Sequence, residues 1–180
     1  MRLLLPEESG FTLVEMVIAT FITTVLVAGL ANLFASGMRA SLDANSRLTS
    51  QSSVRLAFDR LEYEARCAST ATLAGSGADV TLVLPPAPAC AHASGTYTWC
   101  VSNSSLIRYS GSSCSGTPDT FITSVTSPRP FSCITTNKYP ILQVALSVNP
   151  VSRTSDAFAA TDTMDMHNAD TTKAASASCS

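Results

Sequence analysis

One carboxylate, Glu15, lies near the start of an apolar segment that extends from Phe11 to Ala35 and contains no other ionisable side chain. A lone charge in hydrocarbon is costly, and such residues are usually paired and functional. A buried carboxylate is best accommodated when it neutralises a positive charge on a neighbouring group. The position of Glu15 therefore indicates an assembly contact rather than catalysis.

The six cysteines are the second set of side chains that could do chemistry, and all of them follow the apolar segment. An even number of cysteines in the polar part of a chain predicts disulfide bonds formed in an oxidising compartment. Zinc binding and free thiols are the alternatives, but no Cys-x-x-Cys occurs and the two histidines, His92 and His167, are isolated. The candidate disulfide residues are Cys67, Cys90, Cys100, Cys114, Cys133 and Cys179.

The rest of the sequence contains no pattern typical of an active site. No Ser/His/Asp arrangement, phosphate-binding loop or metal-ligand spacing is recognisable. Charged residues make up 13% of the 180 residues, the net charge is −2, and Arg and Lys form no run. Nucleic-acid binding requires a basic surface, so we expect no nucleic-acid partner. Because active-site and metal-ligand patterns are also missing from the sequence, we expect a non-enzymatic protein without a cofactor or a metal.

The elements that position these residues begin with a long helix. The apolar segment has about 25 residues, which give about 37 Å of helix and suffice to cross a bilayer. Apolar residues then recur three and four positions apart, and no proline interrupts residues 11–70. We predict a helix whose residues 11–36 form a transmembrane half and whose residues 37–72 form an amphipathic half that packs against a head domain.

The polar face of the amphipathic half is charged. Opposite charges stand four residues apart on it, and each such pair contributes only a few tenths of a kcal/mol. We therefore predict a solvated face and no catalytic pair of carboxylates. The residues of this face are Arg55, Asp59, Arg60, Glu62, Glu64 and Arg66.

Residues 73–170 are predicted to form a β-rich globular head, and the Ser/Ala-rich residues 171–180 a low-complexity tail. Turn residues at 74–77 are expected to end the helix. The fold class is α+β, with the long helix packed on a small antiparallel sheet. Tyr97 and Trp99 share one face of a strand and are predicted to pack rather than to bind a ligand. Strands are expected over residues 79–84, 96–101, 106–109, 120–125, 141–148 and 158–166.

The block around the carboxylate closely resembles the processing site of type IV prepilins and type II secretion pseudopilins; it reads Glu8-Ser9-Gly10-Phe11-Thr12-Leu13-Val14-Glu15-Met16. In that family a membrane peptidase cuts after the glycine, and the new N-terminal residue is methylated. The resemblance implies that residues 1–10 are a cleaved leader, that the cut falls between Gly10 and Phe11, and that Phe11 is N-methylated. Unlike many leaders of the family, this one is acidic just before the glycine.

The resemblance also implies a partner for Glu15. Cleavage would leave a free α-amine on Phe11, and Glu15 of a neighbouring subunit would neutralise it and set the register of assembly. A carboxylate that reaches out to the membrane interface is the alternative reading of Glu15. For the whole segment, the alternatives are an ordinary membrane anchor and a secretory signal peptide cut near residues 28–35.

These features predict a structural subunit of a type IV pilus or a type II secretion pseudopilus, and a minor subunit in preference to a major one. The strand order and Met166-His167-Asn168 resemble pilins and pseudopilins of the J/W type, although His167 stands where that type has Arg. The implied partners are a prepilin peptidase/N-methyltransferase, other pilin or pseudopilin subunits, the inner-membrane assembly platform and the lipid bilayer. A single-pass anchor in the cytoplasmic membrane would carry the head outside, and later in an extracellular or periplasmic filament.

Other functions are compatible with the same anchor. A tip-located adhesin or a DNA-uptake pilin would need exposed basic or aromatic loops, for which Arg108, Arg129 and Lys138 are the candidates. Only the DNA-uptake pilin would bind nucleic acid. A membrane-anchored secreted binding protein is a further alternative, and an anchored hydrolase is disfavoured because no nucleophile–base pattern is present.

Overall fold

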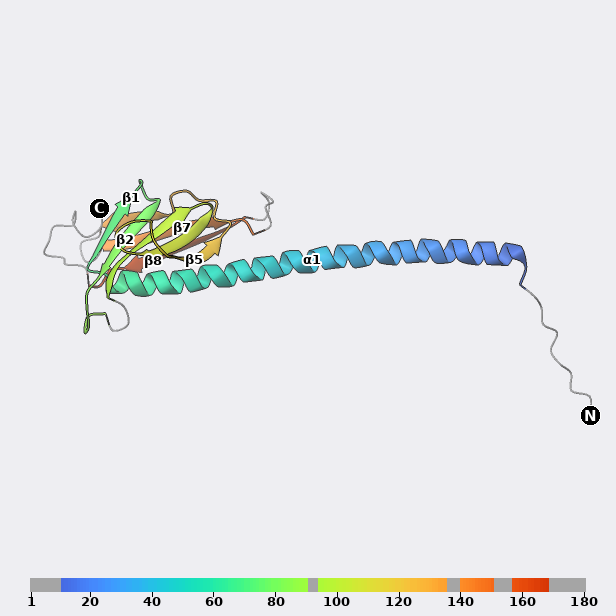
Figure 1. Cartoon of the computed structure of the whole chain (residues 1–180), viewed down its shortest axis with the longest axis horizontal. Helices are drawn as coiled ribbons and strands as arrows, with labels where there is room; N and C mark the ends of the chain where they lie inside the picture. The colour runs from blue at the N-terminus through green and yellow to red at the C-terminus, as the bar shows by residue number, and fades with distance from the viewer. Residues whose placement is uncertain (1–10, 91–93, 136–139, 151–156, 169–180) are drawn as a thin grey trace, which may run out of the picture. The chain divides into compact units, whose positions relative to one another are not determined.

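The computed structural model describes residues 11–90, 94–135, 140–150 and 157–168 (Figure 1). In these ranges it has one helix, α1 (Leu13–Cys67), followed by antiparallel strands, which confirms the predicted α+β fold class. The chain forms two compact units, Met1–Ala44 and Asn45–Ser180, with their boundary inside α1. The predicted leader and tail, together with His92, Lys138 and Cys179, lie outside the described residues.

The larger sheet has the strand order β1-β2-β3-β4-β5, so each strand pairs with its neighbour in the sequence. All of these pairings are antiparallel. The β3–β4 hairpin turns at Asn103 and Ser104, whose φ values of 48° and 56° suit the two-residue turns that match strand twist. The strands are β1 (Thr70–Ala74), β2 (Asp79–Leu84), β3 (Gly95–Ser102), β4 (Ser105–Ser110) and β5 (Pro118–Thr123).

The smaller sheet has the order β6-β7-β8 and is also antiparallel. Its strands are β6 (Phe131–Thr135), β7 (Pro140–Val148) and β8 (Phe158–Asp165). The segment between the two sheets ties them together. Val125 forms an isolated bridge with Val148, and the Thr126 N–H donates to the Ser147 carbonyl at 2.8 Å.

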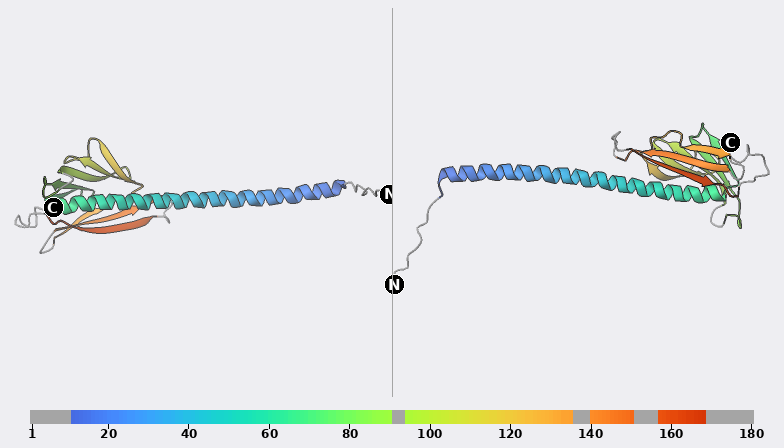
Figure 2. Two further views of the ribbon diagram at one scale, coloured as in Figure 1. Left: turned by 90° about the horizontal axis from the view of Figure 1, so that it is seen from below. Right: turned by 180° about the vertical axis from the view of Figure 1, so that it is seen from behind.

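The C-terminal part of α1 lies along the seam between the two sheets (Figure 2). Val54, Ala57, Leu61 and Ala65 face this seam and are at most 4% exposed. They repeat three and four residues apart, as the amphipathic pattern predicts. The same hydrophobic cluster contains large residues of both sheets, among them Leu82, Trp99, Leu106, Ile122, Leu142, Leu146 and Met164. The helix therefore completes the core between the sheets.

The end of α1 differs from the prediction. The helix ends at Cys67 rather than at residue 72, and β1 begins at Thr70. Ala71 in β1 is fully buried and pairs with Leu82 of β2. Residues 75–78 form the turn between β1 and β2, so the turn residues predicted at 74–77 do not stop the helix. Pairing with β2 supplies partners for backbone groups that a longer helix would have bonded internally, and it buries Ala71 in the core.

The predicted strands correspond to β2, β3, β4, β5, β7 and β8, with small shifts at their ends. Strand β6 was not predicted from the sequence, because Pro128 and Pro130 indicated a break in the chain just before it. The structure accommodates this break. Pro130 donates no backbone hydrogen bond, but its carbonyl accepts one from Ala145 at 2.8 Å, so the pairing with β7 already begins before β6.

Candidate functional site

The helix begins with a reciprocal cap formed by Thr12 and Glu15. Glu15 Oε2 accepts hydrogen bonds from the Thr12 backbone N–H at 3.0 Å and from the Thr12 hydroxyl at 2.9 Å. The Glu15 N–H donates to Thr12 Oγ1 at 3.3 Å. This is a capping box, in which an N-cap threonine and a glutamate three residues later satisfy each other. It holds the carboxylate at the positive end of the helix dipole.

The carboxylate of Glu15 retains capacity for a second partner. Both hydrogen bonds from Thr12 end on Oε2, and within the described residues no hydrogen bond to Oε1 is formed. Oε1 of Glu15, held in this way at the start of the helix, can accept a hydrogen bond from a cationic group of another molecule. Sequence reasoning identified Glu15 but missed Thr12, although Thr-x-x-Glu before an apolar run is a known sign of a helix start.

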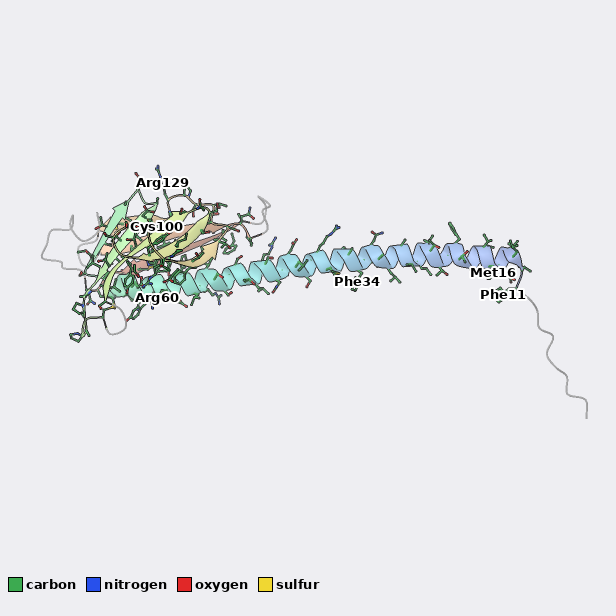
Figure 3. The ribbon with its side chains drawn as sticks, viewed as in Figure 1. Phe11, Met16, Phe34, Arg60, Cys100 and Arg129 are labelled. Carbon is green, nitrogen blue, oxygen red and sulfur yellow. A yellow bond between two sulfur atoms is a disulfide. The ribbon has the colours of Figure 1, made fainter. Side chains whose placement is uncertain are left out.

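The apolar side chains of the first unit are exposed along the helix. Their exposed fractions range from 52% for Ile22 to 80% for Leu13. Figure 3 shows Phe11 beside the start of α1, with Met16 and Phe34 projecting from the helix. The helix is long and apolar enough to cross a membrane, with a mean hydropathy of 2.2 in its most apolar window. Exposed apolar surface of this extent indicates contact with lipid or with other helices.

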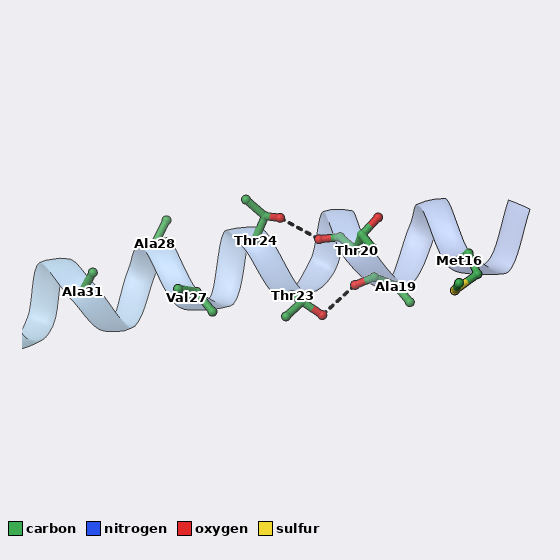
Figure 4. Close-up of a pocket in the computed structure, with 8 residues that line it drawn as sticks. All are labelled: Met16, Ala19, Thr20, Thr23, Thr24, Val27, Ala28 and Ala31. Carbon is green, nitrogen blue, oxygen red and sulfur yellow. Dashed lines mark hydrogen bonds between the residues drawn. The ribbon is translucent and has the colours of Figure 1, made fainter. Parts of the chain in front are cut away.

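Polar side chains within this segment bond to the helix itself. The hydroxyls of Thr23 and Thr24 donate to the carbonyls of Ala19 and Thr20, both at 2.7 Å (Figure 4). Hydroxyls that return to carbonyls one turn earlier do not need water. The threonines are therefore compatible with an apolar environment, and Glu15 is the side chain of residues 11–35 whose charge calls for a partner.

The cysteines among the described residues form disulfides, as predicted. Cys67 at the end of α1 bonds to Cys90, and Cys100 in β3 bonds to Cys114 in the loop after β4. Cys133 is disulfide-bonded as well. The sequence could not select these pairings, because they depend on which strands the topology brings together.

The head contains a buried charge that the sequence analysis placed in solvent. Glu64 is fully buried. Its Oε1 lies 2.9 Å from Arg60 Nε and 2.7 Å from Arg108 Nη2, and its Oε2 accepts a hydrogen bond from Trp99 Nε1 at 2.9 Å. The predicted solvated face is wrong at Glu64, because Arg108 and Trp99 of the larger sheet replace water around the carboxylate.

Arg108 belongs to the same buried cluster and not to an exposed basic loop. Its side chain is 8% exposed, and its Nη1 lies 3.2 Å from Asp119 Oδ2. Its guanidinium lies over the ring of Tyr97, 3.8 Å from the centroid. The proposal of Arg108 as a surface ligand-binding residue is therefore wrong, whereas Arg129 is exposed. The predicted packing role of Tyr97 and Trp99 is confirmed.

The segment after β8 closes the C-terminal end of α1. Met166 is fully buried, and the Asn168 side-chain amide donates to the carbonyls of Cys67 at 3.3 Å and Ala89 at 3.2 Å. One amide thus satisfies a carbonyl at the helix end and another beside the disulfide-bonded Cys90. The motif Met166-His167-Asn168 has a structural role in this fold.

An apolar N-terminal helix followed by a disulfide-bonded β head fits the architecture of a membrane-anchored pilin. Comparison with protein families gives a match for residues 6–31 to the family described as the prokaryotic N-terminal methylation motif. The match is consistent with a type IV prepilin- or pseudopilin-type protein, and such proteins are structural rather than catalytic. They associate in general with a prepilin peptidase and with other pilus subunits. Neither the curated proteins nor the solved structures gave a match.

Proposed function

We propose that the chain is a structural, minor subunit of a type IV pilus or a type II secretion pseudopilus. The observation that carries this proposal is the methylation motif over residues 6–31, placed on a helix whose apolar side chains are exposed. Residues 1–10 act as the leader and residues 11–36 as the transmembrane and filament-core helix. Minor status is supported by a head rich in loops and cysteines.

The first step is processing by a prepilin peptidase/N-methyltransferase, which cuts between Gly10 and Phe11 and methylates the new amine. Phe11 and Thr12 precede the first residue of α1, and Phe11 is 79% exposed. The capping box starts the helix after the cut site, so cleavage leaves the helix and its cap intact. The product carries a positive charge one residue before the cap.

The second step is insertion into the filament next to an existing subunit. The amine of Phe11 and the carboxylate of Glu15 are both costly in an apolar surrounding, and pairing between subunits neutralises both. Glu15 is suited to this role because Thr12 occupies only Oε2. A mismatched subunit would leave two unpaired charges, so the pair selects one axial register.

The topology follows from the same elements. The leader stays in the cytoplasm, the first half of α1 crosses the inner membrane once, and the disulfide-bonded head lies outside. Further partners are other pilin or pseudopilin subunits, the inner-membrane assembly platform and the lipid bilayer. After assembly the head belongs to an extracellular or periplasmic filament.

Processing is tested by expressing the full chain in membranes with and without a prepilin peptidase, followed by intact mass and N-terminal sequencing. We expect a start at methylated Phe11 only when the peptidase is present, and no cleavage of Gly10→Ala. A start at Met1 in both samples, or a cut near residues 28–35, would contradict the proposal.

Assembly is tested with Glu15→Gln, because glutamine preserves the capping box but not the charge. We expect this variant to be cleaved normally and to be absent from filaments, as measured by immunoblotting of sheared or purified filaments. Thr23→Val is the matched control, since it changes a polar group on the same helix without changing charge. Incorporation of Glu15→Gln at the wild-type level would refute the ion-pair role.

A further inference from the structure

An aspartate lies directly beside one of the two disulfides whose cysteines are both described. Asp79 begins β2 and pairs across the sheet with Cys100 of β3, which is bonded to Cys114. A carboxylate oxygen of Asp79 and the two sulfur atoms all lie within 4.8 Å of one another. Because the sulfurs are bonded to each other, this group is a carboxylate against a disulfide and not a set of thiolate ligands.

The two cysteine residues of this disulfide differ in their exposure to solvent. Cys100 is fully buried, whereas Cys114 is exposed in the loop between β4 and β5. A thiol reductant can therefore reach the Cys114 sulfur in the folded protein. The Cys100 sulfur would be the leaving group, and it would carry negative charge in the interior, beside Asp79.

Asp79 occupies a position that is unfavourable for the fold itself. Its side chain is partly buried, and among the described residues its carboxylate forms no hydrogen bond or ion pair. Burial raises the pKa of the Asp79 carboxyl above its ordinary value of 3.8. A charge that costs stability and has no partner is a candidate for a role other than stability.

We propose that Asp79 protects the Cys100–Cys114 disulfide against reduction by anionic thiols. Reduction starts when a thiolate attacks the Cys114 sulfur, forming a mixed disulfide and releasing the electron pair of the S–S bond to Cys100 as a thiolate. A second reductant thiolate then attacks the mixed disulfide, so that two protein thiolates, which take up protons from water, and one oxidised reductant disulfide result.

The carboxylate opposes the first step in two ways. It repels an approaching anionic thiolate, and it raises the energy of the thiolate that develops on Cys100. The Cys67–Cys90 disulfide provides an internal comparison, since in the described part of the chain no Asp, Glu or His ligand atom lies within the same distance of both of its sulfurs. The proposed protection is independent of the assembly role of α1.

The test uses the full oxidised chain in detergent and follows each disulfide by timed alkylation and peptide mass spectrometry. In Asp79→Asn, glutathione should open Cys100–Cys114 at least about fivefold faster than in wild type, the factor for one unit-charge repulsion at about 4.8 Å when it is screened as in bulk water. With cysteamine, a cationic thiol, the increase in the opening rate from wild type to Asp79→Asn should be smaller than with glutathione. Cys67–Cys90 should keep its rate, and Asp165→Asn in β8, with the same change in charge, should behave as wild type.

Equal rates in Asp79→Asn and wild type would overturn the proposal. A slower rate would also overturn it, because it would mean that the disulfide opens only after unfolding, which removal of a buried charge disfavours. If Asp79→Asn does not fold, the wild-type protein still decides the question. In wild type, the ratio of the opening rate with cysteamine to the opening rate with glutathione must then be larger for Cys100–Cys114 than for Cys67–Cys90. Equal ratios for the two disulfides would refute protection by Asp79.

Discussion

The buried cluster around Glu64 makes the sharpest prediction about the stability of the head. Glu64→Gln keeps the size of the side chain and an acceptor for the Trp99 indole, but it removes the negative charge. Arg108, only 8% exposed at its side chain, is then left with Asp119 as its sole carboxylate among the described residues. Asp119 is itself 64% exposed, so water screens its contribution.

The expected loss follows from this burial. Removing one partner of a buried ion pair costs about 3–5 kcal/mol, because the other charge stays behind without compensation. A domain of ordinary stability has about 5–15 kcal/mol in total. Glu64→Gln should therefore lower the unfolding temperature of the head by about 10 °C or more.

The measurement is thermal and urea unfolding of the full oxidised chain in detergent, followed by the near-ultraviolet signal of Trp99. Glu62→Gln is the matched control, because Glu62 pairs with Arg66 on the same helix at the surface. An exposed pair of this kind contributes about 0.5 kcal/mol or less. Equal losses for the two variants would refute the reasoning.

A double variant separates loss of the charge pair from loss of packing. Glu64→Leu with Arg108→Met removes both charges and leaves apolar side chains in their place. Such replacements are often neutral or even stabilising. The double variant should be clearly more stable than Glu64→Leu alone, and additive losses from the two substitutions would show that the two residues do not act as a pair.

Three further predictions concern the head. Gly77 and Gly116 have φ values of 97° and 107°, so alanine at either position costs about 1–3 kcal/mol. Only at Gly77 would a Cβ collide with the Phe131 carbonyl. Gly77→Ala should therefore be less stable in urea unfolding than Gly116→Ala. Equal losses of unfolding free energy in the two variants would count against this contact. Because burial raises the pKa of Asp79, the folded state binds its proton more tightly than the unfolded state does. The associated stability is present below the ordinary pKa of 3.8 and is lost as pH rises through the raised value. Asp79→Asn should abolish this part of the pH dependence and be more stable than wild type at neutral pH. Non-reducing peptide mapping should find Cys67–Cys90, Cys100–Cys114 and a third disulfide that joins Cys133 to the remaining cysteine, Cys179; a free thiol in the secreted head would contradict it.

Local patterns predicted much of the secondary structure. The apolar segment and the amphipathic repeat indicated the helix, and β-rich runs between turn residues indicated β2, β3, β4, β5, β7 and β8. These features depend on residues close together in the sequence, as do the hairpin at Asn103 and the capping box of Thr12 and Glu15. The Thr-x-x-Glu signal of that cap is present at residues 12–15.

The amino-acid sequence by itself determined the membrane-type helix, the methylation motif with Glu15, and the α+β class, because periodicity and short motifs are local. Tertiary structure alone decided that α1 ends at Cys67, that Glu64 is buried, and that Cys100 pairs with Cys114 beside Asp79. The partners in these cases come from strands distant in the sequence. A charged residue on a helix looks the same in sequence whether water or a buried arginine surrounds it, and only the packing of the sheet against the helix distinguishes the two.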